Sequence, residues 1–126
     1  MLSREMIESS NPGTPLLYRG ENHKWYSGIV QEVGRYNGKS YSEAVGFLDV
    51  QPTDARLSGS LRKLWDSTGV AYVVPEVALT GHLPTEELRG ILEAATPRET
   101  ASFYVMEIMQ QLDAIRTNYT PIPASK

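Results

Sequence analysis

Aromatic and basic side chains alternate in the N-terminal third of this 126-residue sequence, over residues 18–41. Aromatic rings stack on bases or sugars and cationic groups hold phosphates, so this mixture is typical of a site for a nucleotide or single-stranded nucleic acid. The same composition also fits a half-buried sheet, in which aromatic residues pack and basic residues keep the outer face soluble. Both interpretations stay open. The candidate ligand-binding residues are Arg19, Lys24, Trp25, Tyr26, Arg35 and Tyr36.

Within that segment, the sequence Leu-Tyr-Arg-Gly-Glu at 17–21 resembles the arginine motif of ADP-ribosyltransferases. The resemblance implies that Arg19 grips the phosphates of NAD, so that Tyr18-Arg19-Gly20 would handle a nucleotide. The chain departs from the family pattern because it has no full Ser-Thr-Ser motif and no Glu-X-Glu or Gln-X-Glu setting for a catalytic glutamate. The residues that the resemblance would place in those two roles are Ser67-Thr68 and one of Glu76, Glu86 or Glu87.

The sequence lacks the other common motifs for metal binding, nucleophilic catalysis and phosphate binding. Cysteine does not occur, which excludes disulfides, thiolate zinc sites and cysteine nucleophiles. His82 and Glu86 lie four residues apart, yet the one other histidine is His23, so we predict no metal site. Neither a glycine-rich phosphate loop nor a Gly-X-Ser-X-Gly elbow occurs. The sequence therefore assigns no catalytic residue and no cofactor. Enzymatic activity stays an open question, with a role other than catalysis favoured.

A wide apolar stripe runs along the segment 97–116, where apolar residues recur at helical spacing. Its methionines have the adaptable side chains common at protein interfaces. A stripe wider than a small domain covers would contact a protein partner or a second copy of the chain, although it would also serve as the longest wall of the core. The leading hypothesis is a non-catalytic protein-binding module, such as an accessory, inhibitor or regulatory protein. Self-association into a homo-oligomer is one form that this binding could take. The predicted interface residues are Phe103, Met106, Met109 and Leu112.

The composition is that of an ordinary globular domain, with 40% hydrophobic and 21% charged residues. The net charge of −3 argues against nucleic acid as the main partner, because such binding depends on neutralising phosphates. No stretch approaches the roughly 18 apolar residues of a membrane span, and the first residues lack the basic flank and apolar run of a signal peptide. We therefore expect no membrane contact and a cytoplasmic location.

The first half of the chain is predicted to form strands. A short strand at 16–18 and a longer one at 25–33 are rich in aromatic and β-branched residues. Asn37-Gly38 favours a tight hairpin turn that leads to a returning segment at 41–50. That segment fits a strand, yet the capping-box spacing that begins at Ser40 also fits a helix, and both interpretations are retained.

The second half is predicted to be mainly helical. Leucines at helical spacing predict a helix at 54–68, and an apolar run between glycine and proline predicts a strand at 70–74 that 76–80 extends after a bend. Two further helices are expected at 84–95 and 97–116, each with a proline at its first position and acidic residues in its first turn.

Together these elements predict an α+β fold, in which a small and mainly antiparallel sheet packs against three helices. The sheet would combine the N-terminal hairpin with the strand near 70–74, and the last helix would be about twenty residues long. The predicted organisation is a flexible leader at 1–14, a single domain at 15–116 and an extended C-terminal tail at 117–126.

Overall fold

The computed structural model describes residues 10–35, 46–57, 59–65, 69–96 and 101–121 of the chain. Over these residues it has a five-stranded antiparallel sheet and three α-helices, so the predicted α+β class is confirmed. The elements in chain order are β1 (Pro15–Arg19), the 3-10 turn η1 (Glu21–His23), β2 (Trp25–Arg35), β3 (Gly46–Pro52), β4 (Arg62–Trp65), β5 (Ala71–Val73), α2 (Glu76–Thr80), α3 (Thr85–Ala94) and α4 (Ala101–Thr117).

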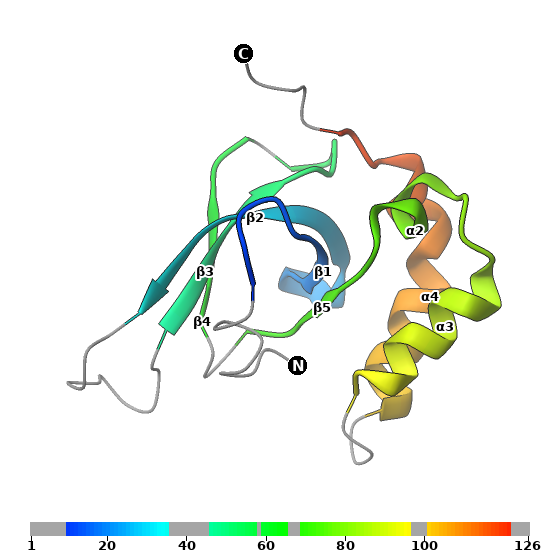
Figure 1. The fold of residues 1–126 in the computed structure, drawn as a ribbon. Coiled ribbons are helices and arrows are strands. Elements are labelled where there is room, and N and C mark those ends of the chain that lie inside the picture. Colours follow the sequence, from blue (N-terminus) through cyan, green and yellow to red (C-terminus); the bar gives the residue numbers. More distant parts are fainter. Residues whose placement is uncertain (1–9, 36–45, 58, 66–68, 97–100, 122–126) are drawn as a thin grey trace.

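The sheet has the strand order β4-β3-β2-β1-β5 (Figure 1). The predicted N-terminal hairpin is the β1–β2 pair, in which Tyr18 lies opposite Tyr26 and Leu16 lies opposite Gly28. The strand predicted near 70–74 is β5, which pairs with β1 at one edge. Because side chains alternate between the two faces of a strand, β1, β2 and β5 contribute to both of two separate clusters, whereas β3 and β4 contribute to one of them.

The helices cover one face of the sheet, and α3 and α4 lie side by side on it (Figure 1). Between them and the sheet lies the main buried cluster, here called the helix-side core. The residues of the helix-side core are Leu17, Trp25, Tyr72, Val74, Ala78, Leu79, Leu88, Leu92, Val105, Ile108, Leu112 and Ile115.

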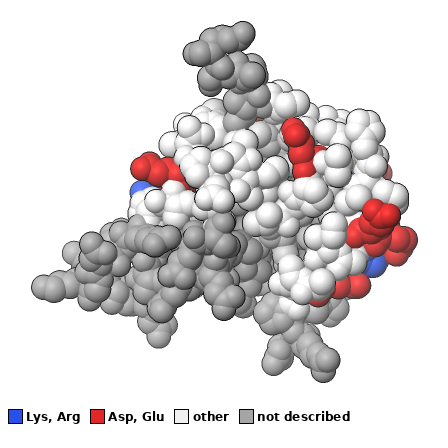
Figure 2. All heavy atoms as spheres, viewed as in Figure 1, with Lys and Arg blue, Asp and Glu red and all other residues white. Residues whose placement is uncertain are grey.

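The outer surface of α3 is acidic. Figure 2 shows acidic side chains gathered at the helical margin of one face of the molecule, over α3.

The opposite face of the sheet has its own smaller cluster, here called the open-face cluster. Tyr26, Val33, Leu57 and Leu64 pack at its margin and are only partly buried. None of its members comes from a described helix. Its buried members are Leu16, Tyr18, Val30, Leu48, Val50 and Ala71.

The helix predicted at 54–68 is wrong. The second half of that segment is β4, whose Leu64 lies opposite Leu48 of β3. Leu57 and Leu64 are seven residues apart, as on one face of a helix. Both reach the open-face cluster because Leu57 lies in a turn and Leu64 in a strand. Leu61, which a helix would have buried, is 48% exposed.

Two other ambiguous segments are resolved. The described part of 41–50 is strand β3, so the strand interpretation holds from Gly46 onward and the helical one is wrong there. Residues 76–80 do not extend β5, because α2 begins directly after Pro75 and ends at Gly81, whose φ of 86° stops the helix. The hairpin turn predicted at Asn37-Gly38 lies outside the described residues.

Both C-terminal helices are confirmed. The helix predicted at 84–95 is α3, with Glu86 and Glu87 in its first turn. The helix predicted at 97–116 is α4, which is described from residue 101 and has 17 residues. Its predicted start at Thr96-Pro97 lies at the border of the described residues.

Short segments outside the predicted domain limits are tied to the fold. Of the leader predicted at 1–14, residues 10–14 are described, and the Gly13 amide donates to the carbonyl of Val30. Of the tail predicted at 117–126, Tyr119 forms a β-bridge with Asp54. Backbone pairing therefore joins residues on either side of 15–116 to β2 and to the turn after β3.

Candidate functional site

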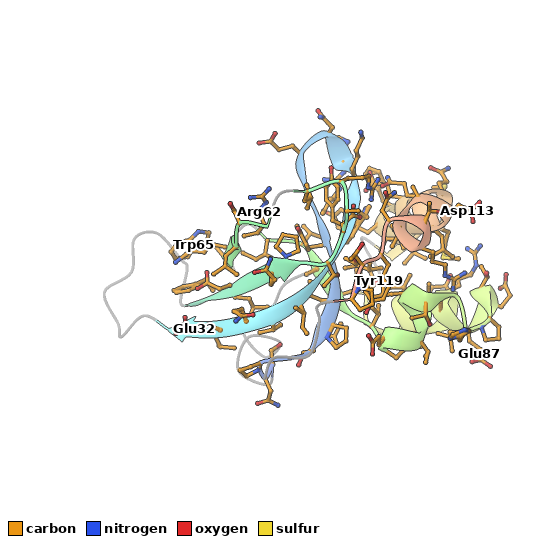
Figure 3. All side chains as sticks on the ribbon, turned by 90° about the horizontal axis from the view of Figure 1, so that it is seen from above. Glu32, Arg62, Trp65, Glu87, Asp113 and Tyr119 are labelled. Atoms are coloured by element: carbon orange, nitrogen blue, oxygen red, sulfur yellow. The ribbon has the colours of Figure 1, made fainter. Side chains whose placement is uncertain are left out.

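A pocket of about 500 Å³ lies on the open face of the sheet, beside the open-face cluster. This volume is within the range typical of small-molecule sites. Figure 3 shows Arg62 on β4, on the side of the molecule away from the helices that carry Glu87 and Asp113. We call this cavity the open-face pocket. Its lining residues are Tyr18, Arg19, Gly20, Glu21, Asn22, Tyr26, Leu57, Arg62, Lys63 and Leu64.

Strand register brings the walls of this pocket together. Tyr18 and Tyr26 are direct partners across β1 and β2, with ring centroids 6.0 Å apart. On the other side, Arg62 lies opposite Val50 of β3, whose side chain is buried in the open-face cluster. Since paired residues of an antiparallel sheet point to the same face, Arg62 belongs to the face that carries Tyr18.

The hydroxyl of Tyr18 is the one buried side-chain polar atom without a hydrogen-bond partner in the part of the chain that the structure describes. The residue is 3% exposed, and burial raises the pKa of Tyr18 to about 12 although the nearby Arg62 charge lowers it. The phenol is therefore neutral near pH 7 and keeps its proton as a hydrogen-bond donor. A buried polar group without a partner is rare and costs free energy.

The basic side chains around the pocket differ in how far they are neutralised. Arg56 donates to both carboxylate oxygens of Asp54 and lies over the Tyr26 ring, and this hydrogen bonding raises the pKa of Arg56. The Lys63 ammonium lies 3.9 Å from Asp49 and 3.9 Å from the centroid of the Phe47 ring.

Arg62 is different, because no ion pair or side-chain hydrogen bond joins it to another described residue. It is also only partly exposed to solvent. A cation in this setting has lost part of its hydration, and no described anion compensates for that loss.

The rim of the pocket is the turn η1, which has an unusual backbone. Asn22 and His23 have φ angles of 61° and 60°, in the left-handed region that residues with a Cβ seldom adopt. Helix α4 holds this turn in place through Gln111, which donates to the carbonyl of His23 and accepts from the amide of Trp25. The strained backbone is thus stabilised from outside the turn.

A second contact with α4, next to the rim, is the ion pair between Arg19 and Glu107. The guanidinium donates two hydrogen bonds of 2.8 Å to the carboxylate of Glu107, and the two side chains are 19% and 13% exposed. The indole N–H of Trp25 donates to the same carboxylate at 2.9 Å. Hydrogen bonds from Arg19, reinforced by that from Trp25, hold the pKa of Glu107 below its ordinary value although burial raises it.

Glu107 should make the stability of the protein depend on pH at the acid end. Its lowered pKa means that the folded state prefers the ionised carboxylate, so this stabilisation is present above the unfolded pKa of about 4.3 and is lost as the pH falls through the folded value. Glu107→Gln should lower the free energy of unfolding by about 2 kcal/mol near pH 7, since hydrogen bonds to charged groups are lost.

Urea unfolding of both proteins between about pH 7 and about pH 3 measures this effect. The difference between wild type and Glu107→Gln should be constant above about pH 5 and should narrow below it. A difference that stays the same across the whole range would contradict an ionised and hydrogen-bonded Glu107.

The structure brings only some of the predicted ligand-binding residues together. Arg19 and Tyr26 line the open-face pocket. Trp25 points to the opposite face and is 0% exposed in the helix-side core, so neither face of its ring is open to a ligand. Lys24 is exposed next to the rim and does not line the pocket. The side chain of Arg35 and all of Tyr36 lie outside the described residues.

The interface predicted on α4 is divided by burial. Phe103 and Met106 are 51% and 52% exposed. Met109 is partly buried against the helix-side core, and Leu112 is 5% exposed within it. The apolar stripe is therefore mainly a core wall, with an exposed remainder in the first half of the helix.

The residues that carry the resemblance to ADP-ribosyltransferases do not form a common site among the described residues. Arg19 is held by Glu107 as described above. Glu76 accepts a hydrogen bond of 2.6 Å from the hydroxyl of Tyr119, and Glu86 and Glu87 lie in the first turn of α3. Ser67-Thr68 lies outside the described residues.

Sequence reasoning missed the residues of β4 that complete the pocket. Arg62 and Leu64 alternate with Lys63, which is a strand signal of only three residues inside a longer helical leucine pattern. Leu57 was assigned to the same helix and not to a pocket wall. The alternation of Arg62 and Leu64 was the available signal, and it was too short to outweigh the leucines.

The chain was also compared with known proteins. No protein-family model, no curated protein and no solved structure matches it. Among the described residues, no group of three or more histidine, aspartate or glutamate side chains is placed to hold a metal ion. No helix in the described part of the chain is both long and apolar enough to cross a membrane.

Proposed function

We propose that this protein is a non-catalytic binding module that takes up a small molecule in the open-face pocket. The observation that carries the proposal is the hydroxyl of Tyr18, which is buried in the wall of this pocket without a hydrogen-bond partner among the described residues. A ligand that accepts its proton would remove the cost of leaving it unpaired.

The rest of the pocket is suited to a compact ligand. Tyr26, Leu57 and Leu64 offer partly buried apolar surface along its walls. Most of the lining residues are polar or charged, and they come from separate elements, with Tyr18 from β1 and Arg62 from β4. In small-molecule sites, placed polar groups fix the orientation of a ligand whose apolar part lies against surface of this kind.

The test begins with Tyr18→Phe, which removes the unpaired hydroxyl and little else. We expect the unliganded variant to be more stable than wild type by about 1 kcal/mol, because a buried donor without an acceptor is removed. Tyr119→Phe is the matched control, since its hydroxyl donates to Glu76 at 2.6 Å and its loss should lower stability by about 1 kcal/mol. Urea unfolding followed by circular dichroism measures both changes.

Binding is then measured by ligand-observed NMR with phenol, benzamide, benzoate and phenyl phosphate as probes. Wild type should bind at least one probe, and Tyr18→Phe should bind it about fivefold or more weakly, since a hydrogen bond contributes about 1 kcal/mol. Leu57→Trp, which fills the pocket from its wall, should bind none. If no probe binds to wild type, or if Tyr18→Phe is less stable than wild type, the proposal is wrong.

Exposed apolar residues on α4 favour a second candidate function, which is contact with a second copy of the chain. The ring of Phe103 stacks on Tyr104 with centroids 5.7 Å apart, and Arg19 lies over both rings, so the exposed side chain is already fixed in place. Fixed aromatic and methionine side chains are common at protein interfaces. In sedimentation velocity runs, wild type should form dimers that Phe103→Ser abolishes. A monomer at every concentration would exclude this candidate.

A further inference from the structure

The charges that line the open-face pocket select the kind of ligand that it can take. Arg19, Arg62 and Lys63 are basic and Glu21 is the acidic residue among the described lining. Arg19 is already neutralised by Glu107, and Lys63 lies near Asp49 and over an aromatic ring. The cation in this lining that has no described counter-ion is Arg62.

Arg62 and Tyr18 both line the open-face pocket. Their strands β4 and β1 present them on the same face of the sheet, and the Arg62 charge is close enough to affect the ionisation of the Tyr18 hydroxyl. Both groups are donors, because a guanidinium has no acceptor and the phenol keeps its proton. A neutral carbonyl would satisfy the hydroxyl but would leave the charge of Arg62 without a partner.

An amine or another cation is disfavoured in this place, since it would meet Arg62 and offer no acceptor to Tyr18. An oxyanion satisfies both groups. The planar guanidinium matches the two oxygens of a carboxylate or phosphate, and a hydrogen bond between charged groups is about twice as strong as a neutral one. The apolar walls at Leu57 and Leu64 would then contact a ring or chain attached to that anion.

We infer that the ligand of the open-face pocket is a small oxyanion with an attached apolar or aromatic group, whose anionic oxygens are held by Arg62 and Tyr18. This inference rests on the proposed function, because it names the chemical class of ligand for the same pocket. The anion is a carboxylate or a phosphate ester, and the choice between them is an arm of the experiment.

The experiment uses pairs of probes that share one aromatic ring system and differ in whether the attached group is anionic or neutral, titrated by NMR into the full chain. The pairs are naphthoate with naphthamide and naphthyl phosphate with naphthol. In each pair the anion should bind wild type about tenfold more tightly or better, as expected when a charge-assisted pair forms. The tighter of the two anions identifies the preferred oxyanion.

Arg62→Gln should remove this preference, with binding of the anion about tenfold weaker and binding of its neutral partner nearly unchanged. Arg89→Gln makes the same change of charge on α3, where Arg89 lies 3.6 Å from Glu86, and should leave both affinities unchanged. Arg62→Lys keeps the charge but loses the planar fork, so it should bind the anion with intermediate affinity and provides a second variant if Arg62→Gln fails to fold.

The outcomes distinguish failure of the proposed small-molecule binding from failure of the oxyanion assignment alone. If neither member of either pair binds, the proposed function fails. If the neutral probes bind as tightly as the anions, or if Arg62→Gln and Arg89→Gln weaken the anion equally, the pocket binds small molecules but the assignment of an oxyanion to Arg62 is wrong.

Discussion

Replacing Trp25 with alanine should lower the free energy of unfolding by about 4 kcal/mol, the range expected when a buried tryptophan is truncated. Trp25 is 0% exposed, and its ring centroid lies 5.8 Å from that of Tyr72 and 6.1 Å from that of Tyr104. The change would leave a cavity between the sheet and α4. It would also remove the indole donor from Glu107, which lies 2.9 Å away.

Urea unfolding followed by circular dichroism gives the measurement, with Trp65→Ala as the matched control. Trp65 is the other tryptophan of the chain, and it is only partly buried, with its ring 5.3 Å from that of Phe47. Its loss should therefore cost less, about 1 to 2 kcal/mol. Equal losses at the two positions would show that Trp25 is not the central residue of the helix-side core.

Replacing Gly28 with alanine should destabilise the protein by about 2 kcal/mol, as is typical of an added methyl group in a packed core. A Cβ at this position would lie 2.4 Å from Cγ1 of Val50 and 3.0 Å from the Tyr18 ring. Both neighbours are buried, at 0% and 3% exposure, so the added methyl group must displace at least one packed side chain. The change should also disturb the open-face pocket, because it displaces Tyr18.

Gly90→Ala is the control, since it adds the same methyl group where nothing lies within 4 Å. Gly90 is in the interior of α3, where alanine is favoured over glycine by about 1 kcal/mol. The same chemical change should thus lower the midpoint of urea unfolding at Gly28 and raise it at Gly90. A gain in stability at both positions would contradict the close approach of Val50 to Gly28.

The sequence contained enough information for the elements whose signals are local. The aromatic and β-branched run that begins at Trp25 is β2, and the capping and periodicity that follow Pro84 are α3. The prediction of a helix at 54–68 was wrong because the spacing of its leucines fits the helical period, while Arg62 to Leu64 also fit the alternation of a strand. Which period applies is decided by pairing with β3, a strand that lies outside that segment.

The candidate site was predictable only where its residues lie on β1 and β2. Arg19 and Tyr26 are predicted from composition, and Tyr18 is named only as a neighbour of Arg19 in the Tyr18-Arg19-Gly20 segment, whereas Arg62 is predicted to lie in a helix. What distinguishes Tyr18 is that its hydroxyl has no hydrogen-bond partner among the described residues, and this property arises only after the strands have assembled. Trp25, by contrast, is a core residue, because alternation along β2 turns it away from Tyr26.

The rim of the pocket also has a consequence for synthesis on the ribosome. Its two anchors on α4 come late in the chain: Glu107 is 88 residues beyond Arg19, and Gln111 is 88 residues beyond His23. At roughly 5 to 20 residues per second, a nascent chain would wait roughly 4 to 18 s between making the rim and making the side chains that hold it. During that interval the left-handed backbone of Asn22 and His23 has no support from Gln111. Ligand binding by the open-face pocket should therefore begin only when the last helix has been released and has docked.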